Sequence, residues 1–180
     1  MDSDIAEILF TEEEIEQKNR ELATQIDHDY SDRDIVAIGI LRGCMFFMAD
    51  LLRLLKVNLT MDVMVVSSYD ETDTVSSGEI EIQKDFSIDV KNKDVLIVED
   101  IVDTGLTLYH VKEHLKKRGA KSVKICTMLD KPSRRNLDVV SDYNGFVIPN
   151  EFVVGYGLGY ANRYRNLKYI GILKPEIYQN

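Results

Sequence analysis

The sequence is short of three things that would each indicate a particular class of protein: cysteine pairs, long apolar runs and an excess of basic residues. Its two cysteines, Cys44 and Cys126, lie in apolar contexts and outside any CxxC motif, so we expect reduced core thiols in a cytoplasmic protein and no zinc site. No apolar segment approaches the ~20 residues of a membrane span. The acidic start, Met1-Asp2-Ser3-Asp4, does not have the pattern of a secretory signal.

The charge balance is acidic, with a formal net charge of -9. This argues against nucleic acid or an anionic membrane surface as the main partner. A small anionic substrate stays possible, because a local cluster of N–H groups, arginine and metal can outweigh a distant net charge. The 180 residues contain no repeat, low-complexity segment or interdomain linker, so we expect a single compact domain.

Short apolar runs alternate with amphipathic segments along most of the chain, which indicates an α/β fold with a mainly parallel sheet. Thr11 and Glu14 have the spacing of a capping box, which predicts a helix that begins after Thr11. We expect further helices at 44–55 and 106–118. Strands are expected at 35–41, 59–67, 80–86 and 123–129 and at the apolar start of the stretch 95–108, with shorter pieces at 146–148, 152–154 and 169–173.

The stretch 95–108 carries the strongest chemical pattern in the chain. Four apolar residues run into Glu99 and Asp100, and Asp103 follows ahead of the turn Thr104–Thr107. A buried strand that ends here would feed a helix N-terminus, whose free N–H groups and dipole attract anions. The adjacent carboxylates suit magnesium, and Asp103 suits a general base. Acids at a strand end can also be merely solvated, but the whole pattern predicts a site for a phosphorylated ligand and a metal.

Residues 68–79 are polar and small, and they separate two strand-like segments. Twelve residues is long for a plain hairpin connection, and such loops often act as lids over a site. Composition alone favours the alternative, a disordered solvated tip.

The stretch 95–108 resembles the phosphoribosyl-pyrophosphate (PRPP) signature of type I phosphoribosyltransferases. Other segments resemble the same family: a pyrophosphate loop, a mobile catalytic loop, a purine-contacting segment and a C-terminal hood. They are Gly39–Gly43, Ser68-Tyr69, Lys131 with Ser133 and Arg134, and 152–158 with 164–167. Together, over residues 35–175, they resemble the hypoxanthine-guanine phosphoribosyltransferase family.

The resemblance implies a fold and an assembly. The fold is a mainly parallel twisted sheet flanked by helices, with a small hood from the terminal segments and a mobile loop. One domain would span 1–180, with its core at about 30–150, its hood at about 151–180 plus the N-terminal segment, and the loop at 68–79. By analogy, a homodimer or homotetramer is expected.

The resemblance also implies a reaction, in which PRPP and a 6-oxopurine give a nucleoside monophosphate and pyrophosphate. Glu99 and Asp100 would hold the ribose hydroxyls and bear on Mg²⁺, and Asp103 would take the N7 proton of the purine. The implied PRPP contacts are Leu41, Arg42, Gly43, Arg165 and the turn residues Asp103, Thr104, Gly105, Leu106 and Thr107. In this family, the peptide bond before the position of Arg42 can be cis.

The implied purine contacts come from two other segments. Lys131 would donate to the purine O6, Phe152 would stack on the ring, and the Val153 backbone would read the 2-position. Ser68 and Tyr69 would close over the site and keep water away from a reactive cation. Arg134 would either support the purine segment or be solvated.

The chain departs from the family pattern at Gly159, where the hood usually carries an aspartate that helps bind a second magnesium ion. We expect activity to survive with a raised magnesium requirement. The loop is also unusually acidic, with Asp70, Glu71 and Asp73. Neutralising these three side chains is expected to lower the KM for PRPP.

Two other classes of protein compete with the transferase. A regulatory PRPP- or nucleotide-binding module could keep the fold and lose the chemistry, although such a sensor has no need of Asp103 as a base. A metal-dependent phosphohydrolase could use Asp100 and Asp103, but those enzymes place the nucleophile directly after the first strand. An assay with hypoxanthine, PRPP and magnesium separates the transferase from the binding module.

Overall fold

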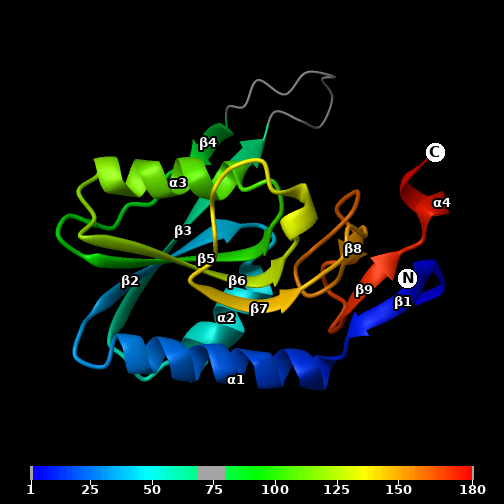
Figure 1. Cartoon of the computed structure of the whole chain (residues 1–180), viewed down its shortest axis with the longest axis horizontal. Coiled ribbons are helices and arrows are strands. Elements are labelled where there is room, and N and C mark those ends of the chain that lie inside the picture. The colour runs from blue at the N-terminus through cyan, green and yellow to red at the C-terminus, as the bar shows by residue number, and fades with distance from the viewer. Residues whose placement is uncertain (1, 69–79, 180) are drawn as a thin grey trace.

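The computed structural model describes residues 2–68 and 80–179, and it contains two sheets with helices packed around the larger one (Figure 1). The strands are β1 (Ile5–Phe10), β2 (Ile35–Leu41), β3 (Leu59–Ser68), β4 (Ile80–Lys84), β5 (Asp94–Val102), β6 (Ser122–Asp130), β7 (Tyr143–Val147), β8 (Val153–Val154) and β9 (Ile170–Leu173). The helices are α1 (Glu12–Asp29), α2 (Met45–Leu54), α3 (Leu106–Lys117) and α4 (Pro175–Tyr178), with short 3-10 turns at Asp2–Asp4 and Pro132–Arg134.

The larger sheet has the strand order β4-β3-β2-β5-β6-β7, and all its neighbours are parallel except β4, which runs antiparallel to β3 at the edge. The predicted mainly parallel α/β fold is therefore confirmed. Helices α1 and α2 cover one face of the sheet, and α3 covers the other (Figure 1). No helix in the described ranges is long and apolar enough to cross a membrane.

The two faces are filled by alternate residues of the same strands, as the pleat of a strand requires. Ile35 and Ala37 of β2 pack in the cluster with α1 and α2, whereas Val36 and Ile38 pack in the cluster with α3. Central strands buried on both faces read as continuous apolar runs in the sequence, which is why these strands could be predicted.

Two other local predictions are also confirmed. Thr11 caps α1, because its side chain accepts the Glu14 N–H while the Glu14 carboxylate accepts the Thr11 N–H. Cys44 and Cys126 are buried free thiols.

The connections from β2 and β5 leave in opposite directions. The chain passes from β2 through α2 to β3 on one side, and from β5 through α3 to β6 on the other. The carboxyl ends of these two neighbouring strands therefore flank a topological switch point, which is where open α/β sheets bind ligands. The segments at this edge are Leu41–Gly43 and Glu99–Thr104.

The second sheet joins the two ends of the chain. Strand β1 pairs antiparallel with β9, and β9 pairs antiparallel with β8. The sequence interpretation did not include β1 or α4, because each is short and is stabilised by partners far along the chain. In Figure 1 the small sheet and α4 lie together at one end of the large sheet.

Candidate active site

Two neighbouring cavities open at the switch point. The β5–α3 cavity, of about 390 Å³, is lined by the following residues: 40–43, Val66, 99–108 and Arg134. The β8–α4 cavity, of about 500 Å³, is lined by the following residues: Ile101, Asp103, Lys131, Arg134, 150–153, Leu158, Gly159, Tyr178 and Gln179. The two cavities share Ile101, Asp103 and Arg134, so a ligand that spans both would pass these three residues.

The turn between β5 and α3 has the geometry of an anion site. Gly105 precedes α3 with φ +86°, a left-handed conformation that favours glycine, and its place for a Cβ lies 3.2 Å from Cδ of Arg135. Oγ1 of Thr104 accepts the Leu106 N–H at 3.3 Å. The first N–H groups of a helix have no intrahelical acceptor, so this end of α3 offers donors to a phosphate.

Glu99 and Asp100 form an adjacent acidic pair at the end of β5, and Glu99 is only 8% exposed. Burial raises the pKa of the Glu99 carboxyl well above its ordinary value, and the charge of Asp100 raises it further. Burial also raises the pKa of Asp100, against the opposing charge of Arg165. Such a pair would be stabilised as carboxylates by a cation brought in with the substrate.

The acidic pair suits magnesium, which shares its ligands with substrate and water, better than it suits a metal ion that is held by protein side chains alone. Among residues 2–68 and 80–179, no group of three or more His, Cys, Asp or Glu side chains is placed to hold a metal ion. Magnesium commonly binds one or two carboxylates together with water and substrate phosphates. Glu99 and Asp100 can supply that share of the ligands.

The loop after β2 is tightly fitted to its neighbours. The Leu41–Arg42 peptide bond is cis, and Arg42 and Gly43 line the β5–α3 cavity. A Cβ on Gly43 would overlap the carboxylate of Asp100, and a Cβ on Gly157 would overlap the Gly43 carbonyl oxygen. Both positions therefore need glycine, because neighbouring atoms leave no room for a Cβ. These close contacts hold the loop after β2, the acidic pair and the 155–158 turn together.

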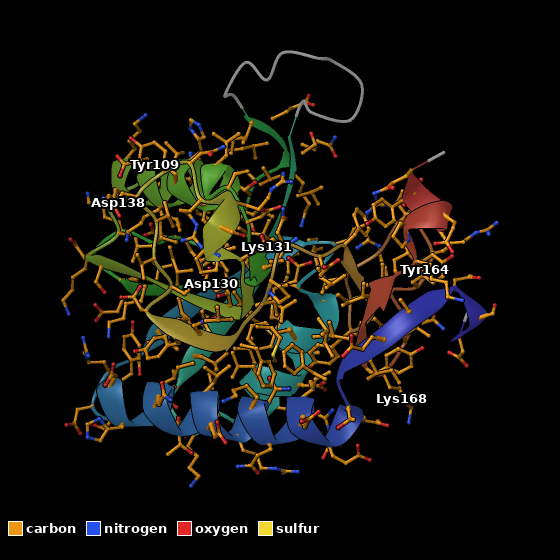
Figure 2. All side chains as sticks on the ribbon, turned by 45° about the vertical axis from the view of Figure 1, so that its right-hand side comes forward. Tyr109, Asp130, Lys131, Asp138, Tyr164 and Lys168 are labelled. Carbon is orange, nitrogen blue, oxygen red and sulfur yellow. The ribbon has the colours of Figure 1, made fainter. Side chains whose placement is uncertain are left out.

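The β8–α4 cavity carries the predicted purine contacts. Lys131 is 8% exposed, its Nζ donates to the Glu151 carbonyl at 2.9 Å, and burial lowers the pKa of its ammonium group. Figure 2 shows Lys131 at the edge of the large sheet that faces the second sheet. Phe152 and Val153 also line this cavity, on the side of the second sheet.

Asp103 lies where the cavities meet, and Arg134 holds it there. Nε of Arg134 donates to Oδ1 of Asp103 at 3.1 Å, with both side chains partly exposed. The structure thus gives Arg134 a contact with Asp103, which the sequence left open. The other Asp103 oxygen is not used in this bond and can serve a substrate in the adjoining cavity.

Arg135 lies behind the same turn and bonds to several segments at once. Its Nε donates to the Asp103 carbonyl at 3.1 Å, and its two Nη atoms donate to the Val139 carbonyl and to the Asp130 carboxylate. Its side chain is 16% exposed. This guanidinium therefore fixes the backbone of the turn from the side away from the cavity.

One predicted PRPP contact in the described ranges, Arg165, lies outside the two sets of lining residues. Among the described residues, Arg165 lines neither cavity; its Nη1 donates to the Gly157 carbonyl at 2.6 Å, and its charge acts on Asp100. Ser68 is the last residue of β3. Tyr69 and the rest of the predicted loop lie outside the described residues.

Gly159 lines the β8–α4 cavity, but its backbone leaves no room for a side chain. A Cβ there would lie 2.7 Å from the Arg163 carbonyl oxygen and 2.7 Å from Cγ of Arg165. An aspartate at this position would therefore need a backbone shift, and it would also displace Arg165.

The sequence interpretation missed several lining residues, among them Ile101, Leu158, Tyr178 and Gln179. Ile101 belongs to the stretch 95–108 that was singled out in the sequence, and its place directly after Asp100 was the available signal. Tyr178 and Gln179 follow Pro175, whose position suits the first residue of a helix. Leu158 was placed in the hood but given no role.

Acidic residues at a strand end, an anion-binding turn and a second cavity at the switch point define a phosphoribosyltransferase type of site. The family model described as "Phosphoribosyl transferase domain" matches residues 6–161. The hypoxanthine-guanine phosphoribosyltransferase of Bacillus subtilis (strain 168) is 51% identical over 180 residues, which cover 100% of this chain and 99% of that protein. The chain therefore belongs to the hypoxanthine-guanine phosphoribosyltransferase family.

Other relatives agree with this membership. The crystal structure of a hypoxanthine phosphoribosyltransferase from Staphylococcus aureus superposes with a TM-score of 0.95 at 49% identity, covering 100% of this chain and 97% of that one. The bifunctional protein TilS/HprT of Listeria monocytogenes serotype 4b (strain F2365) is 53% identical over 178 residues. That match covers 99% of this chain and 27% of the longer protein.

Proposed function

We propose that this chain transfers the 5-phosphoribosyl group of PRPP to a 6-oxopurine, hypoxanthine or guanine, and releases pyrophosphate in purine salvage. The observation that carries the proposal is the position of Asp103, between an anion-binding turn on one side and a cavity with a buried lysine on the other. The names of the full-length relatives support the same reaction.

On the PRPP side, the chain binds and orients. The N–H groups and hydroxyls of the β5–α3 turn hold the 5′-phosphate, and Arg42 with the backbone at Gly43 faces the pyrophosphate. Glu99 and Asp100 accept hydrogen bonds from the ribose hydroxyls and are the residues that would hold Mg²⁺. When bound, this ion supplies charge and Lewis-acid stabilisation for the leaving pyrophosphate.

On the purine side, the chain recognises the base and removes a proton. The Lys131 ammonium donates to O6, which selects 6-oxo over 6-amino bases because an amino group is itself a donor. Phe152 stacks on the ring, and the Val153 backbone meets the 2-position. The Asp103 carboxylate takes the N7 proton as positive charge develops on the ribose.

The test is the formation of a nucleoside monophosphate from PRPP and each of hypoxanthine, guanine and xanthine at varied magnesium. We expect turnover with hypoxanthine or guanine that depends on magnesium. Tight binding of IMP without any turnover would instead identify the regulatory binding module. A cytoplasmic location and a homodimer or homotetramer are part of this proposal, and sedimentation of the purified chain tests the assembly.

The role of Gly159 is a separate part of the proposal. We expect a raised magnesium requirement, because glycine supplies no side-chain oxygen where the family has aspartate. Gly159→Asp alone would be ambiguous, since any Cβ there crowds Arg165. Gly159→Ala is the matched control, and only a fall in the magnesium requirement that is confined to the aspartate variant supports a lost ligand.

A further inference from the structure

The C-terminal turn contributes an aromatic ring to the β8–α4 cavity that the sequence interpretation did not foresee. Tyr178 lines this cavity together with Lys131 and Phe152. Its ring stacks on Phe152 with the centroids 4.6 Å apart and the planes at 23°. One face of Phe152 is therefore already occupied by an aromatic ring of the chain itself.

A third ring completes the arrangement. Tyr160 meets Phe152 edge to face at 5.6 Å and 90°, and it meets Tyr178 at 6.5 Å. Offset-stacked and edge-to-face pairs are the favoured geometries of aromatic rings. We name Phe152, Tyr160 and Tyr178 the aromatic triad. Because its three rings contact one another, Phe152 has little freedom to rotate.

The tail that carries Tyr178 is tied to the second sheet. The Leu173 N–H donates to the Phe152 carbonyl at 2.8 Å, and the Lys174 N–H donates to the Asp4 carbonyl at 2.9 Å. Oη of Tyr164 donates to Asp4 at 2.9 Å, and Figure 2 shows Tyr164 on the side of α4. Tyr178 thus packs into the hydrophobic cluster of the second sheet, with its ring held against Phe152.

We propose that Tyr178 is a positioning residue of the purine site, which holds the Phe152 ring in the plane that stacks on the base. The inference rests on the proposed function and deepens it at the base cavity. Preorganisation of the ring lowers the cost of ordering it when the base binds. The effect should therefore appear in affinity for the base and not in affinity for PRPP.

The experiment compares four versions of the full chain: wild type, Tyr178→Leu, Tyr178→Phe and Ile177→Ala. We expect Tyr178→Leu to raise the KM for hypoxanthine ~3- to 10-fold, the range that a stacked aromatic pair supplies. The KM for PRPP should change less than about 2-fold. The conservative variant Tyr178→Phe should rescue most of the lost affinity, because it restores the ring.

Ile177→Ala is the matched control, since Ile177 packs in the same cluster but does not line the cavity. It should lower the melting temperature without the selective rise in KM for hypoxanthine. An equal rise in this control, or an unchanged or lowered KM in Tyr178→Leu, would overturn the proposal. A lowered KM would mean that the tyrosine ring occupies the place of the base.

A double variant tests whether Tyr178 acts through Phe152. In a Phe152→Leu background, the further change Tyr178→Leu should add little to the rise in KM. Rises that multiply would show that Tyr178 contacts the base independently, against the proposal. The Kd of IMP, measured by calorimetry on the same variants, keeps this test valid even if the wild-type chain shows no turnover and the proposed function fails.

Discussion

The two cavities of the site are built in different ways. The β5–α3 cavity takes ten of its lining residues from one unbroken stretch, 99–108, and most of the rest from 40–43. The β8–α4 cavity collects single residues and short pieces from five parts of the chain, including the C-terminal turn. One cavity is therefore a property of a local strand–turn–helix unit, whereas the other exists only when the second sheet has docked.

Because of this difference, we expect the two cavities to respond differently to amino-acid substitutions. Backbone N–H groups and glycines in close contact make much of the β5–α3 cavity, so a substitution that shifts the backbone there is expected to disturb the whole cavity. Side chains from separate elements make the base side, so its shape can change one residue at a time. The variants below test this contrast, beginning with the residue that both cavities share.

Asp103→Asn should have the largest effect, because it removes the proposed general base from the junction of the two cavities. We expect kcat to fall ~10²- to 10⁴-fold, the usual contribution of a positioned general base. The Kd of IMP should change little, since the amide is close to the carboxylate in size. A fall in kcat of less than about 10-fold would show that Asp103 is not the general base and that the junction only binds the substrate.

Arg135→Gln should damage the phosphate side selectively. Loss of charge-assisted bonds to the turn is expected to raise the KM for PRPP ~10- to 100-fold, with a smaller change in the KM for hypoxanthine. Arg135→Lys is the control that keeps the charge without the planar fork, and it should recover only part of the affinity. Equal losses for both substrates would break the contrast between the cavities.

Lys131→Met should have the opposite selectivity and weaken binding of the purine base more than binding of PRPP. We expect the KM for hypoxanthine to rise ~10-fold while the KM for PRPP stays unchanged, because the variant loses the proposed charge-assisted bond to O6. The ratio of kcat/KM for hypoxanthine to that for adenine should fall as well. If this ratio stays constant, Lys131 does not discriminate between 6-oxo and 6-amino bases.

Asp62→Asn tests a site that lines neither cavity and should leave activity at pH 7 unchanged. The Asp62 carboxylate accepts from the Ser87 N–H at 2.7 Å, a bond that lowers its pKa to about 2. A lowered folded-state pKa stabilises the fold above the ordinary value of 3.8, and this stability is lost as the pH falls toward 2. The carboxylate is partly solvated, so we expect a contribution of about 1 kcal/mol.

The measurement is the free energy of unfolding from urea titrations at several pH values. Wild type should lose this contribution between about pH 4 and pH 2, and Asp62→Asn should give a flatter curve over the same interval. Parallel curves for the two proteins would mean that another carboxyl group carries the acid sensitivity.

The sequence predicted the residues of the β5–α3 cavity better than those of the β8–α4 cavity, because the first is formed mainly by one local segment and the second by distant ones. The buried strands, the capped helix and the strand–turn–helix at 95–108 follow local patterns of burial and capping, and the structure confirms these elements. The contact between Arg134 and Asp103 depends on how the end of β6 sits against the end of β5, which no local pattern records. The family resemblance identified Phe152 as a purine contact, but the stacking of Tyr178 on Phe152 could be found only from the structure.

The pairing of β1 with β9 also bears on the order in which the two cavities form during protein synthesis. Ile5 pairs with Leu173, so the second sheet cannot be completed until the segment around residue 173 has been synthesised. All six strands of the large sheet end by Val147, so their backbone pairing can form while the remaining residues are still being added. Contacts between distant segments are slow to form because long loops must close first. We therefore expect a nascent chain to form the β5–α3 cavity before the β8–α4 cavity.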